Sequence, residues 1–229
     1  MKKTAVFDID GTIFRSSLLI ETVEALLSAR LFPESAREEF AGEFEKWLTR
    51  KGDYESYIGA VIEVFMKYIK GVAYAEFMDA VEKMMEQEKD KVYVYTRDLL
   101  KELKKKDYFL LAISQSPKSI VDKFCKNLGF DKAYGRIYEL GPQNRFTGNV
   151  TDVHLIENKA NIVRRAVEKE GLTLADSYGI GDTESDISFL ELVEHPICFN
   201  PNQKLYRHAK LNTWKVVVER KNVIYEIPT

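Results

Sequence analysis

The sequence predicts an α/β fold in which a doubly wound parallel sheet is interrupted by an inserted helical domain. An apolar, β-rich run at residues 4–9 is typical of a buried strand. Residues 16–88 then show almost only helical periodicity. From about residue 93 onward, strand and helix patterns alternate, which is typical of a parallel sheet with helices on both faces.

The first strand ends in two carboxylates. The stretch VFDIDGT at residues 6–12 places Asp8 and Asp10 among residues suited to the inside of a sheet, and a Gly-Thr turn follows at once. Side chains two residues apart in a strand point to the same side, and two close carboxylates repel unless a cation or a shared proton lies between them. Taken alone, the pair is also compatible with a turn aspartate and a helix N-cap.

The inserted segment divides at residues that usually begin or end helices. Pro33 suits the first turn of a second helix, and Asp53 suits the N-cap of a third. The four predicted helices span residues 17–31, 33–50, 53–70 and 73–88. We therefore predict a core domain made of residues 1–15 and 90–229 and an all-helical domain made of residues 16–89.

The second half of the chain supplies the rest of the predicted sheet and its covering helices. Predicted helices span residues 95–106, 117–129, 158–171, 184–193 and 202–210. Predicted strands span residues 108–114, 177–182, 195–200 and 214–219, with a further β-rich pair at 132–140 and 145–151. The order is that of repeated strand–helix units.

Composition excludes several classes of partner. Hydrophobic residues make up 45% and charged residues 31%, and the 34 basic and 36 acidic residues give a net charge of −2, so no nucleic-acid partner or anionic membrane is indicated. The N-terminal apolar run contains Asp8 and Asp10 and does not suit a signal peptide, and no stretch approaches the roughly 18 apolar residues of a membrane span. Cys125 and Cys198 are expected to be buried free thiols in a reducing cytoplasm. A cytoplasmic location is therefore predicted, and the oligomeric state is left open.

Carboxylates recur where predicted strands end. Asp182 leaves its strand as Asp8 does, and Asp186 lies four residues later, one turn into the next helix. Because ligands bind at the carboxyl ends of parallel strands, Asp8, Asp10, Asp182 and Asp186 are expected to converge there. Such a cluster needs a divalent cation, and an all-oxygen ligand set suits Mg²⁺ rather than zinc. The histidines show no zinc-site spacing and are expected to be structural or on the surface: His154, His195 and His208.

Two further polar residues suit phosphate binding. Ser114 follows the strand YFLLAI, and Lys159 lies at the start of a nearby predicted helix. A lysine and a metal ion offset the charge of phosphoryl oxygens, a hydroxyl donates a hydrogen bond to them, and a carboxylate can attack phosphorus. Since the chain has neither a GxxxxGK[ST] loop nor a GxGxxG turn, the phosphate is not expected in a nucleotide-binding loop.

These residues together resemble the motifs of the haloacid dehalogenase (HAD) superfamily, in the branch similar to phosphoserine phosphatases. The matching stretches, in order, are DIDGT, AISQSP with Ser114, NKANIV with Lys159, and GDTESD with Asp182 and Asp186. The helical segment lies between the first and second motifs, where this branch carries a helical cap. FTGNV and the C-terminal NPNQKLYRHAKLNTWKVV are also similar to that branch. The resemblance implies a HAD-like core with an inserted cap and covers nearly the whole chain.

The resemblance implies a two-step phosphatase mechanism on a small phosphorylated metabolite. Asp8 would be the nucleophile that forms an aspartyl-phosphate. Asp10 would protonate the leaving oxygen and then activate water. The other implied roles are Mg²⁺ ligation by Asp8, the backbone carbonyl of Asp10 and Asp182, phosphate binding by Ser114 and Lys159, and orientation of the lysine and a metal-bound water by Asp186. Gly11 would allow close backbone approach, and Thr12 is either a turn former or a direct participant.

One position departs from the branch. Phosphoserine phosphatases carry a glutamate shortly after the first motif that meets the substrate's amino group, and this chain has Ser17 there, with Glu21 about one turn later. Phosphoserine is therefore not favoured as the substrate. Arg15 is expected to face solvent, with a contact to a second anionic group of the substrate as the alternative.

Two other functions are compatible with the same residues. A phosphotransferase or mutase would use the same intermediate, but a general base at Asp10 hastens hydrolysis of a phosphoaspartate. A non-catalytic phosphate-ligand-binding regulatory protein could share the fold, but the motif positions all keep chemically competent side chains. Hydrolysis is therefore the favoured prediction, and fold alone does not identify the substrate.

Overall fold

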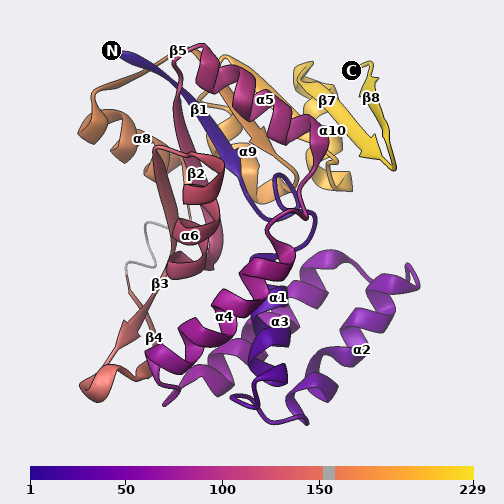
Figure 1. Cartoon of the computed structure of the whole chain (residues 1–229). Coiled ribbons are helices and arrows are strands. Elements are labelled where there is room, and N and C mark those ends of the chain that lie inside the picture. The colour runs from indigo at the N-terminus through magenta and orange to yellow at the C-terminus, as the bar shows by residue number, and fades with distance from the viewer. Residues whose placement is uncertain (152–157) are drawn as a thin grey trace. The chain divides into compact units, whose positions relative to one another are not determined.

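The computed structural model describes residues 1–151 and 158–229 and confirms the α/β fold. Contacts divide the chain into two compact units, each drawn in Figure 1. The core unit comprises Met1–Ser16, Lys91–Arg136 and the described residues after Thr151. The helical unit comprises Ser17–Asp90 and Ile137–Thr151.

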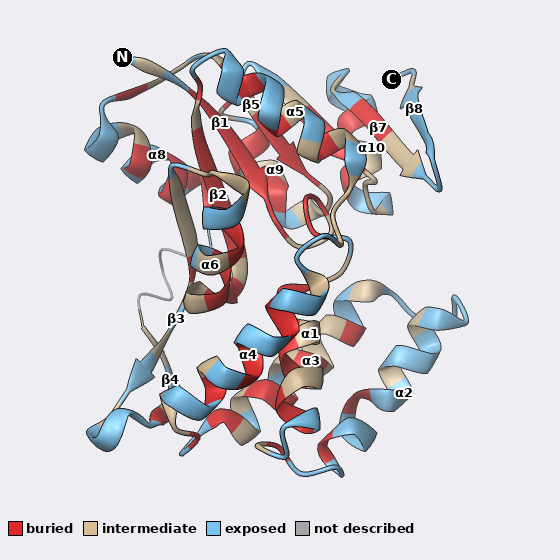
Figure 2. Ribbon diagram, in the orientation of Figure 1, coloured by how far each residue is buried: buried red, intermediate tan, exposed pale blue. Residues whose placement is uncertain are grey.

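The described strands form one eight-stranded sheet, and the part of it from Ile137 to Thr151 belongs to the helical unit. The strands are β1 (Lys2–Asp8), β2 (Phe109–Pro117), β3 (Lys132–Leu140), β4 (Phe146–Thr151), β5 (Leu172–Gly181), β6 (His195–Phe199), β7 (Lys215–Arg220) and β8 (Val223–Ile227). Their hydrogen-bonded order is β4-β3-β2-β1-β5-β6-β7-β8, antiparallel at β3–β4 and β7–β8 and parallel elsewhere. The sequence did not predict β8, an edge strand whose residues are mostly exposed (Figure 2). Among the described strands it pairs with β7, and its apolar residues Val223, Ile224 and Tyr225 are exposed, unlike those of the buried strands.

Helices cover both faces of this sheet. They are α5 (Val94–Lys105), α6 (Lys118–Leu128), α8 (Lys159–Glu170), α9 (Ile187–Leu190) and α10 (Gln203–Asn212). Because strand side chains alternate, Val6 packs with residues of α8, α9 and α10, whereas its neighbour Phe7 packs edge-on against Phe130, just after α6. Burial on both faces explains why Ala5, Val6 and Phe7 of β1 are consecutive apolar residues, and Figure 2 shows the central strands as the most buried part of the core unit.

The register of the sheet determines where the candidate site lies. Asp8 of β1 is paired with Ile113 of β2, and Phe7 is paired with Ile180 of β5. Ser114 directly follows Ile113, and Asp182 lies two residues after Ile180, just past the end of β5, so both reach the same carboxyl edge of the sheet as Asp8.

The helical unit contains α1 (Leu18–Ser28), α2 (Ala36–Leu48), α3 (Tyr54–Ile69) and α4 (Tyr74–Glu88). Asp53 caps α3 as predicted, because its carboxylate accepts a hydrogen bond of 2.8 Å from the Ser56 backbone N–H. The prediction for Pro33 was wrong: α2 begins at Ala36, after a turn. Among the described residues, no helix is both long and apolar enough to cross a membrane.

The helical unit also takes up a β-hairpin that the sequence assigned to the core domain. Residues 137–151 group with it through backbone hydrogen bonds from Gly71 to Phe146 and from Phe146 to Val72, at 2.8 and 3.0 Å. The Phe146 ring packs on Phe77 with centroids 5.0 Å apart. The unit is therefore not made of helices alone, as residues 16–89 were expected to be.

Candidate active site

A buried lysine joins two of the predicted carboxylates. Lys159 Nζ lies 2.6 Å from Asp8 Oδ1 and 2.5 Å from Asp186 Oδ1, and all three residues are less than 5% exposed. The Asn158 side chain caps α8 by accepting a hydrogen bond of 3.0 Å from Ala160 N–H, which places Lys159 at the helix start. Burial alone would lower the pKa of Lys159, but the carboxylates of Asp186 and Asp8 raise it above its ordinary value. The lysine is therefore a fixed positive charge.

Asp186 also shapes the turn that carries Asp182. Its Oδ2 accepts hydrogen bonds from the backbone N–H groups of Asp182 and Thr183, each at 3.0 Å. Asp182 Oδ1 accepts a further hydrogen bond of 3.2 Å from the Thr12 hydroxyl. Asp182 is thus held from both sides, by the turn after β5 and by the loop after β1.

Gly11 makes this close approach possible. Its φ is +79°, and a Cβ at this position would lie 2.2 Å from Asp182 Oδ2. The next residue, Thr12, is buried, and its carbonyl accepts a hydrogen bond of 2.8 Å from the hydroxyl of Thr96 on α5. The loop after β1 is therefore fixed against both Asp182 and α5.

Asp10 lies in a separate set of hydrogen bonds. Its Oδ2 accepts from the Ser114 hydroxyl at 2.5 Å, and the Ser116 hydroxyl lies 3.0 Å from Oδ1 and 3.1 Å from Oδ2. The sequence predicted Ser114 but not Ser116. The signal was present, because residues 114 and 116 lie two apart in β2 and so point to the same side.

The residues present fit a divalent cation. Oxygen atoms of Asp8, Asp182 and Asp186 lie within 4.8 Å of one another, and Lys159 is the cation that bonds to two of these carboxylates. Burial raises the pKa of Asp8 to about 8, against the opposing effect of Lys159, and raises the pKa of Asp182 well above its ordinary value. Full ionisation of these carboxylates would leave more negative charge than one ammonium offsets, so protons are retained in the metal-free fold, and the oxygen donors suit Mg²⁺. The Asp10 side chain is not in this cluster, whereas Asp186 is.

We expect Mg²⁺ to change how stability depends on pH. The Asp8 pKa is about 8 in the metal-free fold against an ordinary 3.8. At a pH between those two pKa values, the native state holds a proton that the unfolded chain has released. The contribution of Asp8 to the free energy of unfolding is therefore fully present at low pH and decreases as pH rises, by up to about 1.4 kcal/mol per pH unit. Mg²⁺ held by Asp8 would require its ionised form and would therefore remove this slope. Urea unfolding from about pH 5 to 8, with Mg²⁺ or with chelator, measures the difference.

Asp8→Asn is the matched control for this expectation, because an amide does not titrate and the metal-free slope should become shallower. Equal slopes in Mg²⁺ and in chelator for the natural chain would contradict the cation assignment.

The other predicted residues lie outside this arrangement. Arg15 is exposed, with its guanidinium 5.6 Å from the centroid of the Tyr93 ring. His195 pairs with Asp176 at 2.7 Å on the surface, His208 packs against Trp214, and His154 lies outside the described residues. Both cysteines are buried and free, as predicted.

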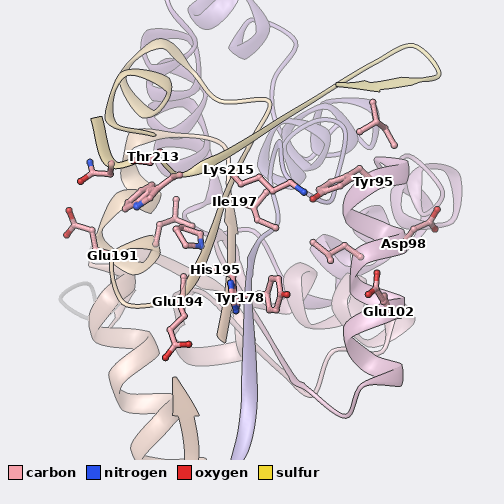
Figure 3. Close-up of a pocket in the computed structure, with 17 residues that line it drawn as sticks. Tyr95, Asp98, Glu102, Tyr178, Glu191, Glu194, His195, Ile197, Thr213 and Lys215 are labelled. Atoms are coloured by element: carbon pink, nitrogen blue, oxygen red, sulfur yellow. The ribbon is translucent and has the colours of Figure 1, made fainter. Parts of the chain in front are cut away.

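A cavity of about 1060 Å³ lies elsewhere in the core unit. Figure 3 shows it lined by residues such as Tyr178, His195 and Lys215, from β5 and the amino ends of β6 and β7. The described lining residues include none of the carboxylates, serines or the lysine discussed above. Charged groups at its rim have partners within the chain, as in the ion pair between Glu102 and Lys106. The described residues of the carboxylate cluster therefore lie outside this cavity.

The chain matches a known protein family. A family model described as haloacid dehalogenase-like hydrolase matches residues 5–191, a range that begins in β1 and includes Lys159 and Asp186.

Individual relatives have low to moderate sequence identity to this chain. A histidinol-phosphatase of Neisseria meningitidis serogroup C (strain 8013) is 31% identical over 112 residues, covering 47% of this chain and 50% of that protein. A phosphoserine phosphatase of Mycobacterium tuberculosis (strain ATCC 25618 / H37Rv) is 23% identical over 214 residues, covering 93% of this chain and 69% of that protein. A solved structure described as a phospho-aspartyl intermediate analogue of phosphoserine phosphatase has a TM-score of 0.65 at 20% identity, over 96% of this chain and 95% of that one. The chain therefore spans about half the length of the Neisseria protein, and the structural likeness is one of fold.

Proposed function

Because this chain belongs to the haloacid dehalogenase-like hydrolase family, we propose that it is a Mg²⁺-dependent phosphomonoester hydrolase. Its substrate would be a small phosphorylated metabolite, and its intermediate a phosphorylated Asp8. The observation that carries the proposal is the buried Asp8 carboxylate, bonded to Lys159 and within reach of Asp182 and Asp186. The phosphatase names of the Neisseria and Mycobacterium relatives support the same reaction class.

In the first half-reaction, a carboxylate oxygen of Asp8 attacks phosphorus, and the bond from phosphorus to the ester oxygen breaks. Asp10 gives its proton to that oxygen, so the alcohol leaves neutral and the phosphoryl group stays on Asp8. The position of Asp10, two residues after Asp8 and hydrogen-bonded to Ser114 and Ser116, supports this assignment.

In the second half-reaction, a water oxygen attacks the same phosphorus. The ionised Asp10 takes a proton from that water, the bond from phosphorus to Asp8 breaks, and inorganic phosphate leaves. Asp8 regains its carboxylate, and Asp10 regains the proton needed for the next turnover.

Positive charge stabilises the phosphoryl oxygens in both steps. Lys159 supplies a permanent charge, and the Ser114 hydroxyl can turn from Asp10 to donate to a phosphoryl oxygen. Asp8, Asp182 and the Asp10 backbone carbonyl would hold Mg²⁺, which when bound supplies further positive charge there. Asp186 would keep Lys159 in place.

The proposal is tested by turnover of an activated aryl phosphate. We expect hydrolysis with Mg²⁺ and a loss of roughly 100-fold or more in excess chelator, since metal-ion charge stabilisation is worth several kcal/mol. Activity should return when Mg²⁺ is restored, and Ca²⁺ should not replace it because its larger, looser coordination shell misplaces the nucleophile. Undiminished turnover in chelator would rule out the metal requirement.

L-phosphoserine is not expected to be the best substrate. Ser17 is 3% exposed, and its hydroxyl caps α1 by accepting a hydrogen bond of 3.2 Å from Leu19 N–H. It therefore offers an ammonium group no charge partner. Such a pair in a closed site is worth a few kcal/mol, or roughly two orders of magnitude in kcat/KM. A panel of phosphomonoesters measures this directly, and a kcat/KM for phosphoserine above all others would disprove the expectation.

A further inference from the structure

The second serine of the SQSP stretch, Ser116, contacts both carboxylate oxygens of Asp10. Its hydroxyl lies within 3.1 Å of both carboxylate oxygens of Asp10, whereas the Ser114 hydroxyl reaches only Oδ2. The Ser116 backbone N–H also donates to Ser114 Oγ at 2.9 Å. Since Ser114 Oγ accepts that hydrogen bond, its own hydrogen is directed toward Asp10.

The backbone around Ser116 is held tightly. The next residue is Pro117, which disfavours helical geometry at Ser116 and keeps it extended. Gly135 of β3 lies so close that a Cβ there would be 3.0 Å from the Ser116 carbonyl oxygen and 2.7 Å from Lys118 Cα. Ser116 is only 3% exposed, so water competes little for its hydroxyl.

From these contacts we infer that Ser116 is a positioning residue for Asp10. The inference rests on the proposed function, in which Ser114 turns its hydroxyl to the phosphoryl group. Asp10 then loses the Ser114 hydroxyl as a hydrogen-bond donor in the step for which its orientation matters. Ser116 keeps its hydrogen bonds to the carboxyl group, so that Asp10 stays aimed first at the leaving oxygen and then at the attacking water.

The test is a double-mutant cycle on kcat with Mg²⁺ present. Ser116→Ala removes the hydroxyl and keeps the backbone N–H that positions Ser114. We expect kcat to fall roughly 10- to 100-fold, the loss typical of one hydrogen bond to a charged group, with little change in KM. In the Asp10→Asn background the same substitution should cost almost nothing, because the carboxylate that it positions is already gone.

A merely structural serine would behave differently, and Ser177→Ala is the matched control. Ser177 is fully buried in the same unit, and its hydroxyl donates to the Leu174 carbonyl, away from Asp10. This variant should keep the kcat of the natural chain. Intact-mass measurement during turnover should also show more phosphorylated protein in Ser116→Ala than in the natural chain, since the water-activating step is slowed.

Several outcomes would overturn the inference. One is an unchanged kcat in Ser116→Ala. Another is a kcat of the Ser116→Ala/Asp10→Asn variant that falls by the full product of the two single losses. A third is a change in KM with no change in kcat. If those occur while Asp8 is still phosphorylated in the natural chain, the inference fails and the proposed function stands. If the natural chain forms no phosphorylated Asp8, both fail together.

Discussion

Asp8→Asn is expected to abolish hydrolysis, with a loss on the order of 10⁶-fold, the size found when a covalent nucleophile is removed. The amide has no anionic oxygen to attack phosphorus, and it is a poorer ligand for a divalent cation. The variant should still fold. Lys159 keeps its 2.5 Å contact with Asp186, and the substitution removes a carboxylate whose pKa burial raises to about 8.

The measurement is single-turnover and steady-state hydrolysis of an aryl phosphate, together with intact mass after an acid quench. Asp98→Asn is the matched control, because it makes the same change on an exposed face of α5. Its activity should equal that of the natural chain. Near-normal turnover or phosphorylation in Asp8→Asn would show that another group is the nucleophile.

Much of this site could be predicted because it depends on strand ends. Apolar runs such as AVF in β1 mark buried strands, and a polar residue directly after such a run lies at the sheet edge. That reasoning identified Asp8, Ser114 and Asp182, and the observed register places all three at one edge. It needed no knowledge of which strands are neighbours.

Contacts between distant segments could not be predicted in the same way. The hairpin at residues 137–151 belongs to the helical unit because Phe146 packs on Phe77 and bonds to Val72, and no local pattern in either segment records that pairing. The hydrogen bond from the Thr96 hydroxyl to the Thr12 carbonyl could not be predicted either, because the two residues are 84 positions apart in the sequence. Strand β8 was missed although Val223, Ile224 and Tyr225 suit a strand, because the turn that joins it to β7 contains no glycine to mark a hairpin.

Ser116 is a different kind of omission. Its period-two spacing from Ser114 was visible, but one serine was sufficient for a phosphate-binding prediction, and the second had no partner to suggest it. Only the structure shows both hydroxyls on Asp10, because the direction of a side chain at a strand end depends on Pro117 and on the close approach of Gly135.

Asp10→Asn is expected to fail in a different way from Asp8→Asn. The variant keeps the backbone carbonyl of residue 10. The Ser114 and Ser116 hydroxyls can rotate to donate to the amide oxygen or to accept from the amide N–H, so the site should still bind substrate. It lacks the acid and the base, and general catalysis of this kind is worth about 10² to 10⁴ in each step. An aryl phosphate has a good leaving group and needs the acid less than the intermediate needs the base. Phosphorylation of Asp8 should therefore outrun its hydrolysis.

The expected result is a protein that accumulates one phosphoryl group within the first turnover and then loses it slowly. Intact mass after an acid quench measures the added group, and peptide mapping should locate it at Asp8. The double variant Asp8→Asn/Asp10→Asn is the control and should remain unlabelled. An alkyl phosphate with a poor leaving group should label Asp10→Asn far more slowly, because its first step depends on the missing acid. If Asp10→Asn clears its phosphoryl group as fast as the natural chain, the water-activating base is a different residue.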